Sequence, residues 1–116
     1  MGHMSTESPT VFERIVAREI PADIVFESEA VIAFRDIAPQ APVHILVVPK
    51  TAKYANVAEL AAGDAPLLAE IVAVAAQVAG GDHRLVFNSG PDAGQTVFHV
   101  HAHVLAGGLE EGTLAK

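Results

Sequence analysis

The chain has 116 residues, a net charge of −7 and an apolar content of 51%, which suits one small domain with its own core. Its lysines and arginines are scattered along the chain, so no basic stripe is present that could follow a nucleic-acid polymer. Cysteine is absent, which excludes a disulfide framework and a thiolate metal site, and the longest charge-free apolar run, Ile71–Ala79, is too short to cross a bilayer.

The two ends of the sequence are predicted to lie outside the folded domain. Residues 1–9 are interpreted as a tag remnant followed by a disordered segment, without the charged and apolar regions of a signal peptide. We therefore expect a cytoplasmic protein with one domain over residues 10–109 and a polar C-terminal tail over residues 110–116.

The first predicted helix covers Val11–Glu19. Thr10 is a suitable N-cap for it, Glu13 completes a capping box, and Pro21 stops the helix. Its apolar side chains recur at helical spacing, which predicts that one face covers a core; they are Val11, Phe12, Ile15 and Val16.

Three short strands are predicted next. Ile24–Glu27 and Ala30–Arg35 are rich in β-branched and aromatic residues and are expected to form a hairpin. A loop with two prolines then leads to the strand His44–Val48. Side chains alternate along a strand, so His44 lies on the face opposite to Ile45.

A long helix is predicted in the middle of the chain, after a single helical turn at Val57–Leu60. It runs from its N-cap Asp64 to Ala79, where two glycines end it. Only Glu70 and Gln77 are clearly polar in its body, so nearly the whole circumference is apolar. One small sheet covers one side of such a helix, and we expect the other side to pack against a second copy of the chain.

A fourth strand, Arg84–Asn88, leads into the Gly-rich loop Ser89–Thr96. Two interpretations of this loop remain open: an ordinary hairpin connection, which also needs glycine, or a phosphate-binding loop that uses backbone N–H groups. The loop delivers the chain into Phe98–Leu105, where histidines alternate with apolar residues. This period of two predicts a strand.

The three histidines of this strand, His99, His101 and His103, are predicted to share one face. A metal site is one explanation, but the Cα atoms of His99 and His103 would be about 13 Å apart at about 3.3 Å per residue. Zinc holds its nitrogen ligands at about 2.1 Å, so all three could converge on one ion only from nearly maximal reach. Catalysis is favoured, because imidazole titrates at about pH 6.5 and serves as nucleophile or proton donor.

The pattern His-φ-His-φ-His-φ-φ, with φ apolar, is the signature of the histidine-triad (HIT) family, and His99–Leu105 matches it in full. The resemblance extends from about Val11 to Gly108 and is closest to the Hint branch, through Ala33–Pro42, His44–Lys50 and Gly94–Phe98. It implies a single α+β domain with an antiparallel sheet of about five strands and two helices, and with sheets extended across a homodimer.

The resemblance also implies a reaction. Hint-like proteins typically hydrolyse purine nucleoside 5′-phosphoramidates, such as adenosine 5′-phosphoramidate, to the nucleoside monophosphate and an amine. For this chain we expect no metal and no other cofactor. By position, His101 is the nucleophile that forms a nucleotidyl-histidine. His103, together with Thr96, contacts the phosphate or the leaving group, and His99 and His44 complete the histidine network.

The residues implied to bind the nucleotide fall into three groups. The phosphate side comprises Asn88, Gly94 and Gln95, and Asp36 accepts hydrogen bonds from the ribose hydroxyls. An apolar wall surrounds the purine; its members are Phe12, Ile15, Phe34, Ile37 and Leu46, with Val11 beside them.

The sequence departs from the Hint pattern at three places. Thr10 and Glu13 stand where some relatives have metal-binding cysteines, Arg35 stands where a histidine is common, and the aromatic C-terminal ending of animal relatives is missing. Dinucleoside polyphosphate hydrolysis is a rival activity with the same triad, whereas His103 argues against the nucleotidyltransferase branch, which has glutamine there. A nucleotide-binding regulatory protein with weak activity and a metal-binding module are the remaining alternatives.

Overall fold

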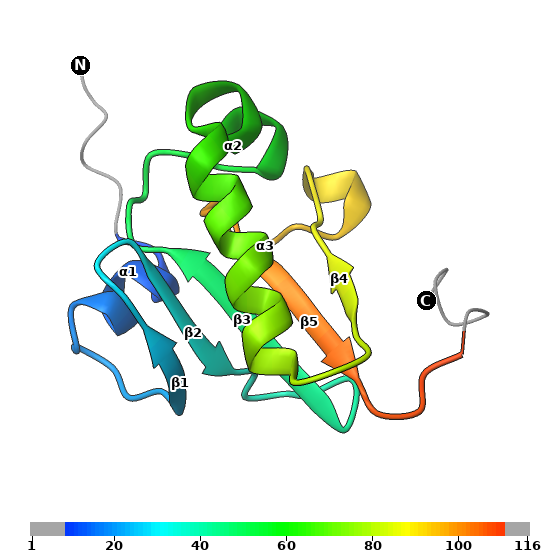
Figure 1. Cartoon of the computed structure of the whole chain (residues 1–116). Helices are drawn as coiled ribbons and strands as arrows, with labels where there is room; N and C mark the ends of the chain where they lie inside the picture. The colour runs from blue at the N-terminus through cyan, green and yellow to red at the C-terminus, as the bar shows by residue number, and fades with distance from the viewer. Residues whose placement is uncertain (1–8, 111–116) are drawn as a thin grey trace, which may run out of the picture.

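The computed structural model describes residues 9–110, so the predicted tag remnant and nearly all of the C-terminal tail lie outside the described residues. The chain combines α-helices with one β-sheet, and the fold is α+β as expected (Figure 1). In chain order the elements are α1 (Val11–Val16), β1 (Ile24–Glu27), β2 (Val31–Arg35), β3 (Val43–Pro49), α2 (Val57–Gly63), α3 (Ala65–Ala79), β4 (Arg84–Val86), the 3-10 helix η2 (Pro91–Ala93) and β5 (Ala102–Ala106).

The strands form one antiparallel sheet in the order β1-β2-β3-β5-β4, which confirms the predicted five-stranded sheet and the β1–β2 hairpin. The last strand of the chain is therefore inserted between β3 and the edge strand β4 (Figure 1). The expectation of two helices is wrong, because the described residues contain three α-helices. The turn predicted at Val57–Leu60 continues to Gly63, and Asn56 caps its start by accepting from the Glu59 N–H.

Two predicted boundaries near the histidines differ from the structure. The first helix ends at Val16 rather than Glu19, because Arg18 adopts a left-handed conformation with φ of 63°. The strand predicted from Phe98 begins only at Ala102, since the preceding residues bend instead of pairing with β3. Strand β4 is also shorter than predicted and ends at Val86.

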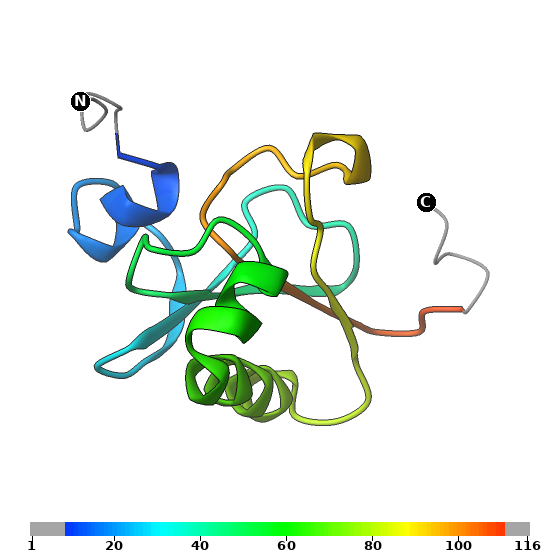
Figure 2. The ribbon, with the colours of Figure 1, turned by 90° about the horizontal axis from the view of Figure 1, so that it is seen from above.

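The two faces of the sheet carry different helices. Helices α2 and α3 cover one face, while α1 and the segment that leads into β5 lie on the opposite side (Figure 2). Strand alternation divides the apolar side chains accordingly. On the α3 side the strands contribute Val31, Ala33, Ile45, Val47, Ala102 and Val104 to the core. On the α1 side Phe12 and Ile15 pack against Ile32, Phe34, Leu46 and Val48.

Helix α3 has the caps that the sequence predicts. The Asp64 carboxylate accepts from the Leu67 N–H at 3.1 Å, and Gly80 ends the helix in a left-handed conformation. Its inner face is buried against the sheet through Leu67, Ile71, Val74 and Ala75. Its outer face is exposed in the single chain and includes Ala69, Val72, Ala73 and Ala76. In the part of the chain that is described, no helix combines the length and the apolar character needed to span a membrane.

The chain after β5 approaches the residue before β3 so closely that only a glycine fits there. Gly107 has φ of 106°, and a Cβ atom added there would lie 2.7 Å from Cβ of Pro42. We expect Gly107→Ala to lower the free energy of unfolding by about 2–4 kcal/mol, since it combines backbone strain with a steric clash. Gly108→Ala is the matched control, because Gly108 has φ of 78° and no heavy atom within 4 Å of such a Cβ. Equal losses in urea denaturation of the two variants would show that contact with Pro42 has no energetic role.

Candidate active site

The three histidines of the triad lie in different structural settings. Only His103 belongs to strand β5, whereas His101 directly precedes it and His99 lies in the bent segment before. His99 is fully buried and His101 and His103 are half-buried. The rings of His101 and His103 are neighbours, with centroids 5.0 Å apart. His99 therefore belongs to the protein interior, whereas His101 and His103 lie nearer the surface.

The hydrogen bonds of His99 fix its tautomer. Its Nε2 lies 2.8 Å from the carbonyl oxygen of Pro49, which can only accept, so Nε2 carries the proton. Its Nδ1 then has a lone pair and accepts from the Thr10 hydroxyl at 3.3 Å. Burial lowers the pKa of His99, which favours this neutral form.

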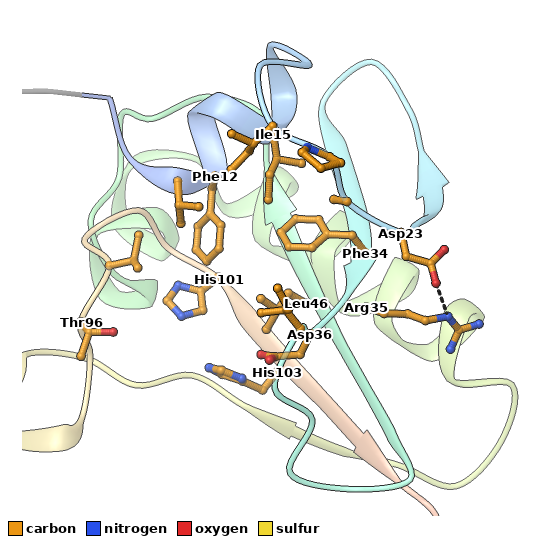
Figure 3. A pocket seen from close by; sticks show the side chains of 16 residues that line it. Phe12, Ile15, Asp23, Phe34, Arg35, Asp36, Leu46, Thr96, His101 and His103 are labelled. Carbon is orange, nitrogen blue, oxygen red and sulfur yellow. Dashed lines mark ion pairs between the residues drawn. The ribbon is translucent and has the colours of Figure 1, made fainter.

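His101 is held so that its other nitrogen is available for chemistry. Its Nδ1 donates to the carbonyl oxygen of His99 at 2.9 Å, so Nε2 is unprotonated. Burial lowers the pKa of His101 as well, and its ring stands in the pocket below Phe12 (Figure 3). The two rings meet edge to face with centroids 4.9 Å apart. The result is a neutral imidazole with a fixed lone pair at the pocket.

A second chain of hydrogen bonds sets His103. The backbone N–H of Gln40 donates to Nδ1 of His44 at 3.0 Å, so the proton of His44 is on Nε2. That Nε2 lies 2.9 Å from Nδ1 of His103, which therefore accepts and leaves the proton of His103 on Nε2. Burial, with contributions from His101 and His44, lowers the pKa of His103 to about 4. At neutral pH His103 is thus an uncharged donor beside the lone pair of His101.

The pocket lined by His101 and His103 has a volume of about 830 Å³, within the range of small-molecule sites. Asp36 and Thr96 join the two histidines as polar lining residues (Figure 3). The other walls are largely apolar and come mainly from α1, β2, β3 and their flanking residues: Val11, Phe12, Ile15, Ile20, Phe34, Ile37, Leu46 and Val97. One cavity therefore combines an extended apolar surface with a nucleophile, a hydrogen-bond donor and a carboxylate.

Most of the residues selected from the sequence line this pocket. They are Phe12, Ile15, Phe34, Asp36, Ile37, Leu46, Thr96, His101 and His103. Ile37 is fully exposed there, whereas Phe34 and Leu46 are buried. Among the remaining selected residues, His99 and His44 reach the pocket through their neighbours in the hydrogen-bond network. Asn88, Gly94 and Gln95 are not part of its lining.

Gln95 braces the Gly-rich loop. Its side-chain oxygen accepts from the Gly90 N–H at 2.8 Å, and its amide nitrogen donates to the carbonyls of Ala55 at 2.6 Å and Val97 at 3.0 Å. The carboxamide is buried and is engaged at both ends. Because these bonds cross the loop on both sides of Thr96, they hold Thr96 at the pocket.

Two charged residues that line the pocket, Asp23 and Arg35, are not among those selected from the sequence. Arg35 and Asp23 form an ion pair of 3.1 Å at the pocket, and the Arg35 N–H also donates to the Asp23 carbonyl at 3.0 Å (Figure 3). Both side chains are more than half exposed. Their opposite charges, just before the first strand and at the end of the second strand of a predicted hairpin, are a sequence signal for pairing. Nothing in the sequence indicates that the pair borders a pocket.

One group near the pocket has the composition of a metal site. The side-chain ligand atoms of Asp36, His44 and His103 lie within 4.8 Å of one another. Nε2 of His44 and Nδ1 of His103 share a hydrogen bond, and Nε2 of His44 is also 3.5 Å from the Asp36 carboxylate. A metal ion bound by His44 would have to replace one of the two hydrogen bonds of its ring, either the one with His103 or the one from the Gln40 N–H.

Comparison with known proteins agrees with this architecture. The sequence family described as "Scavenger mRNA decapping enzyme C-term binding" matches residues 9–115. A HIT-like protein of Synechococcus elongatus is 48% identical over 103 residues, covering 84% of this chain and 90% of the relative. The purine nucleoside phosphoramidase of Escherichia coli is 40% identical over 104 residues, covering 84% of this chain and 87% of the relative.

The solved structures that resemble this fold include a HIT family hydrolase from Clostridium thermocellum. It superposes with a TM-score of 0.82 at 44% identity, covering 92% of this chain and 96% of that one. A five-stranded antiparallel sheet with a fixed imidazole lone pair at an open pocket defines a small α+β enzyme with histidine-based chemistry. The family match and the identity to these relatives show that the chain belongs to the histidine-triad (HIT) family. The Escherichia coli and Clostridium thermocellum relatives are named as a phosphoramidase and a hydrolase.

The lowered histidine pKa values predict an acid-sensitive fold. Imidazoles in the unfolded chain take up protons near pH 6.5, whereas His103 does so in the folded protein only near pH 4. Between these values the unfolded state binds more protons, so the free energy of unfolding is expected to fall as the pH is lowered through this window. Denaturant titrations at a series of pH values measure the slope, and His103→Asn is expected to reduce it. NMR titration of His103 near pH 6.5 would contradict this assignment.

Proposed function

We propose that this protein hydrolyses nucleoside 5′-phosphoramidates of the adenosine 5′-phosphoramidate type through a nucleotidyl-histidine intermediate. The observation that carries the proposal is the hydrogen bond from Nδ1 of His101 to the His99 carbonyl, because it leaves the Nε2 lone pair at the pocket. The name of the 40% identical Escherichia coli relative, purine nucleoside phosphoramidase, supports the choice of substrate. The products are a nucleoside monophosphate and an amine, and no cofactor takes part.

In the first step, Nε2 of His101 attacks the α-phosphorus and the P–N bond breaks. The new bond leaves a positive charge on the imidazole, which the His99 carbonyl stabilises through the Nδ1–H that it already holds. The departing amine takes up one proton from solvent. Nε2–H of His103 donates a hydrogen bond to a phosphoryl oxygen or to the leaving nitrogen, where negative charge develops.

In the second step, water attacks the phosphorus of the nucleotidyl-histidine. The P–N bond to His101 breaks, the imidazole returns to its neutral form, and the water gives up the proton that balances the one taken by the amine. The lowered pKa of His101 assists this step, because a less basic imidazole is a better leaving group.

The apolar walls suit a nucleobase, and the carboxylate suits a ribose. Phe12 and Phe34 present rings on neighbouring sides of the pocket, with centroids 5.8 Å apart. Asp36 is held by the Ala38 N–H, which donates to its Oδ1 at 2.7 Å, and it accepts from the ribose hydroxyls in this proposal. Thr96 contacts the phosphate from the opposite wall, with Asn88, Gly94 and Gln95 in the surrounding loop.

A panel of adenosine and guanosine phosphoramidates tests the proposed activity. We expect turnover of these compounds to exceed turnover of a diadenosine polyphosphate, measured as kcat/KM under the same conditions. A preference for the polyphosphate would assign the protein to dinucleoside polyphosphate hydrolysis. Tight AMP binding with negligible turnover of every compound would instead indicate a nucleotide-binding regulatory protein.

His101→Ala and His101→Gly are expected to abolish turnover, with a loss of at least about 10³-fold, while AMP affinity changes little. The reason is that the nucleophile is removed but the proposed base and ribose contacts remain on other elements. Calorimetric AMP binding and steady-state kinetics measure the two effects. A variant with a near-native rate would mean that another group attacks the phosphorus.

Catalysis is expected to be indifferent to chelators. Both nitrogens of His44 are already engaged, Nε2 in the hydrogen bond with Nδ1 of His103 and Nδ1 as acceptor for the Gln40 N–H. Rates in EDTA should equal rates in buffer alone. Loss of activity in EDTA that added zinc restores would show that Asp36, His44 and His103 work as a metal site.

We also propose that the protein is a homodimer formed through the outer face of α3. Val72 is 44% exposed in the single chain, and Ala69, Ala73 and Ala76 surround it with further apolar surface. Val72→Glu and Ala76→Glu are expected to give monomers, because each would bring like charges together across a self-contacting surface. Gln77→Glu, which adds the same charge at an already polar exposed position, is the control. A monomer mass by light scattering for the unchanged protein at micromolar concentration would refute the dimer.

A further inference from the structure

The N-terminal end of α1 lies directly against the most buried histidine. Thr10, the N-cap of α1, is 89 residues before His99 in sequence, yet its hydroxyl oxygen is 3.3 Å from Nδ1 of His99. The same oxygen accepts from the Glu13 N–H at 3.2 Å, and the Glu13 carboxylate accepts from the Thr10 N–H at 2.8 Å. The capping box of α1 is therefore joined to the triad.

The direction of this contact follows from the neighbouring bonds. Nε2–H of His99 donates to Pro49, so Nδ1 of the neutral ring accepts and the Thr10 hydroxyl is the donor. Thr10 thus uses its lone pair for the helix and its proton for His99. His99 is 0% exposed, so the lone pair of its Nδ1 accepts from the Thr10 hydroxyl and not from solvent.

The contact continues to the nucleophile in one more step. The carbonyl of His99 accepts from Nδ1 of His101 at 2.9 Å, so the position of His99 determines where Nε2 of His101 points. Phe12, two residues after Thr10, packs edge to face on both rings, with centroids 5.7 Å from His99 and 4.9 Å from His101. Thr10 and Phe12 together hold α1 on the histidine segment, while Phe12 also lines the pocket.

We infer that Thr10 is a positioning residue for His101: its hydroxyl donates to His99, and through His99 it aligns the lone pair of the nucleophile. The inference rests on the proposed role of His101. Thr10 would then have two roles, because the hydroxyl that caps the start of α1 also orients the histidine segment. One side chain thereby fixes the position of the nucleophile relative to the apolar residues that α1 contributes to the pocket.

Three substitutions separate the two tasks of Thr10. Thr10→Ser keeps a hydroxyl that both caps the helix and donates. Thr10→Asp keeps an effective N-cap, but an ionised carboxylate has no proton to donate to His99. Thr10→Val has nearly the same shape and loses both functions. Asp64→Ala is the matched control for lost capping alone, since Asp64 caps α3 on the other side of the sheet.

We expect Thr10→Ser to retain kcat within about twofold, and Thr10→Asp and Thr10→Val to lower kcat by about 10- to 100-fold with KM and AMP affinity nearly unchanged. Thr10→Asp should keep a melting temperature close to that of the unchanged protein. Asp64→Ala should lower the melting temperature without lowering kcat. Native kcat in Thr10→Asp, or a loss in Asp64→Ala equal to that in Thr10→Val, would overturn the inference.

A readout without substrate separates this inference from the proposed function. Nitrogen-15 NMR of the imidazoles reports the tautomer of His101, which should be Nδ1–H in the unchanged protein and in Thr10→Ser and mixed in Thr10→Asp. Reaction of His101 with diethyl pyrocarbonate, followed by mass spectrometry, should slow in parallel. If the unchanged protein turns over no phosphoramidate, the proposed function fails, and these two measurements still decide the positioning role. Identical tautomers and reaction rates in all variants would overturn it.

Discussion

The hydrogen bond from Nδ1 of His101 to the carbonyl of His99 is the constraint on which the site depends. A neutral imidazole has one donor and one acceptor nitrogen, so fixing the donor on the backbone determines which nitrogen has the lone pair and where it points. The bend before β5 is what brings this carbonyl within reach of the next-but-one side chain, and a paired strand would have used the same carbonyl in the sheet ladder. Because β5 starts only at Ala102, the His99 carbonyl is available to fix the tautomer of His101.

The sheet separates stability from chemistry. Side chains that alternate to one face of β3 and β5, such as Ile45, Val47 and Val104, pack under α3 in an apolar core. Those on the other face include His44 and His103, which meet in a hydrogen bond across the two strands. Because the two sets share a rigid backbone but lie on opposite faces, the α3 side can be densely packed while the α1 side remains open as a pocket.

Burial provides the protonation states that the site needs. His99, His101 and His103 all have lowered pKa values, with desolvation as the largest cause. A network of neutral imidazoles can be arranged with one proton per ring, each donated in a defined direction, whereas adjacent imidazolium ions would repel one another. The cost is acid sensitivity, since the unfolded chain accepts protons that the folded site resists.

Sequence alone determined the elements whose signal is local. Alternating histidines and apolar residues identified His99, His101 and His103, and helical spacing with the caps Asp64 and Gly80 defined α3. The same alternation could not show that Phe98–His101 is unpaired, because an extended segment has a period of two whether or not it joins a sheet.

Only the tertiary structure decided the contacts between distant segments. Pairing of β3 with β5 sets His44 opposite Leu105 and thus diagonal to His103, and the loop before β3 brings Asp36 beside them. Docking of α1 places the Thr10 hydroxyl on His99, 89 residues away. The physical reason is that a sequence pattern fixes which face a side chain takes, whereas its partner depends on strand order and on how helices dock, and these are properties of the whole fold.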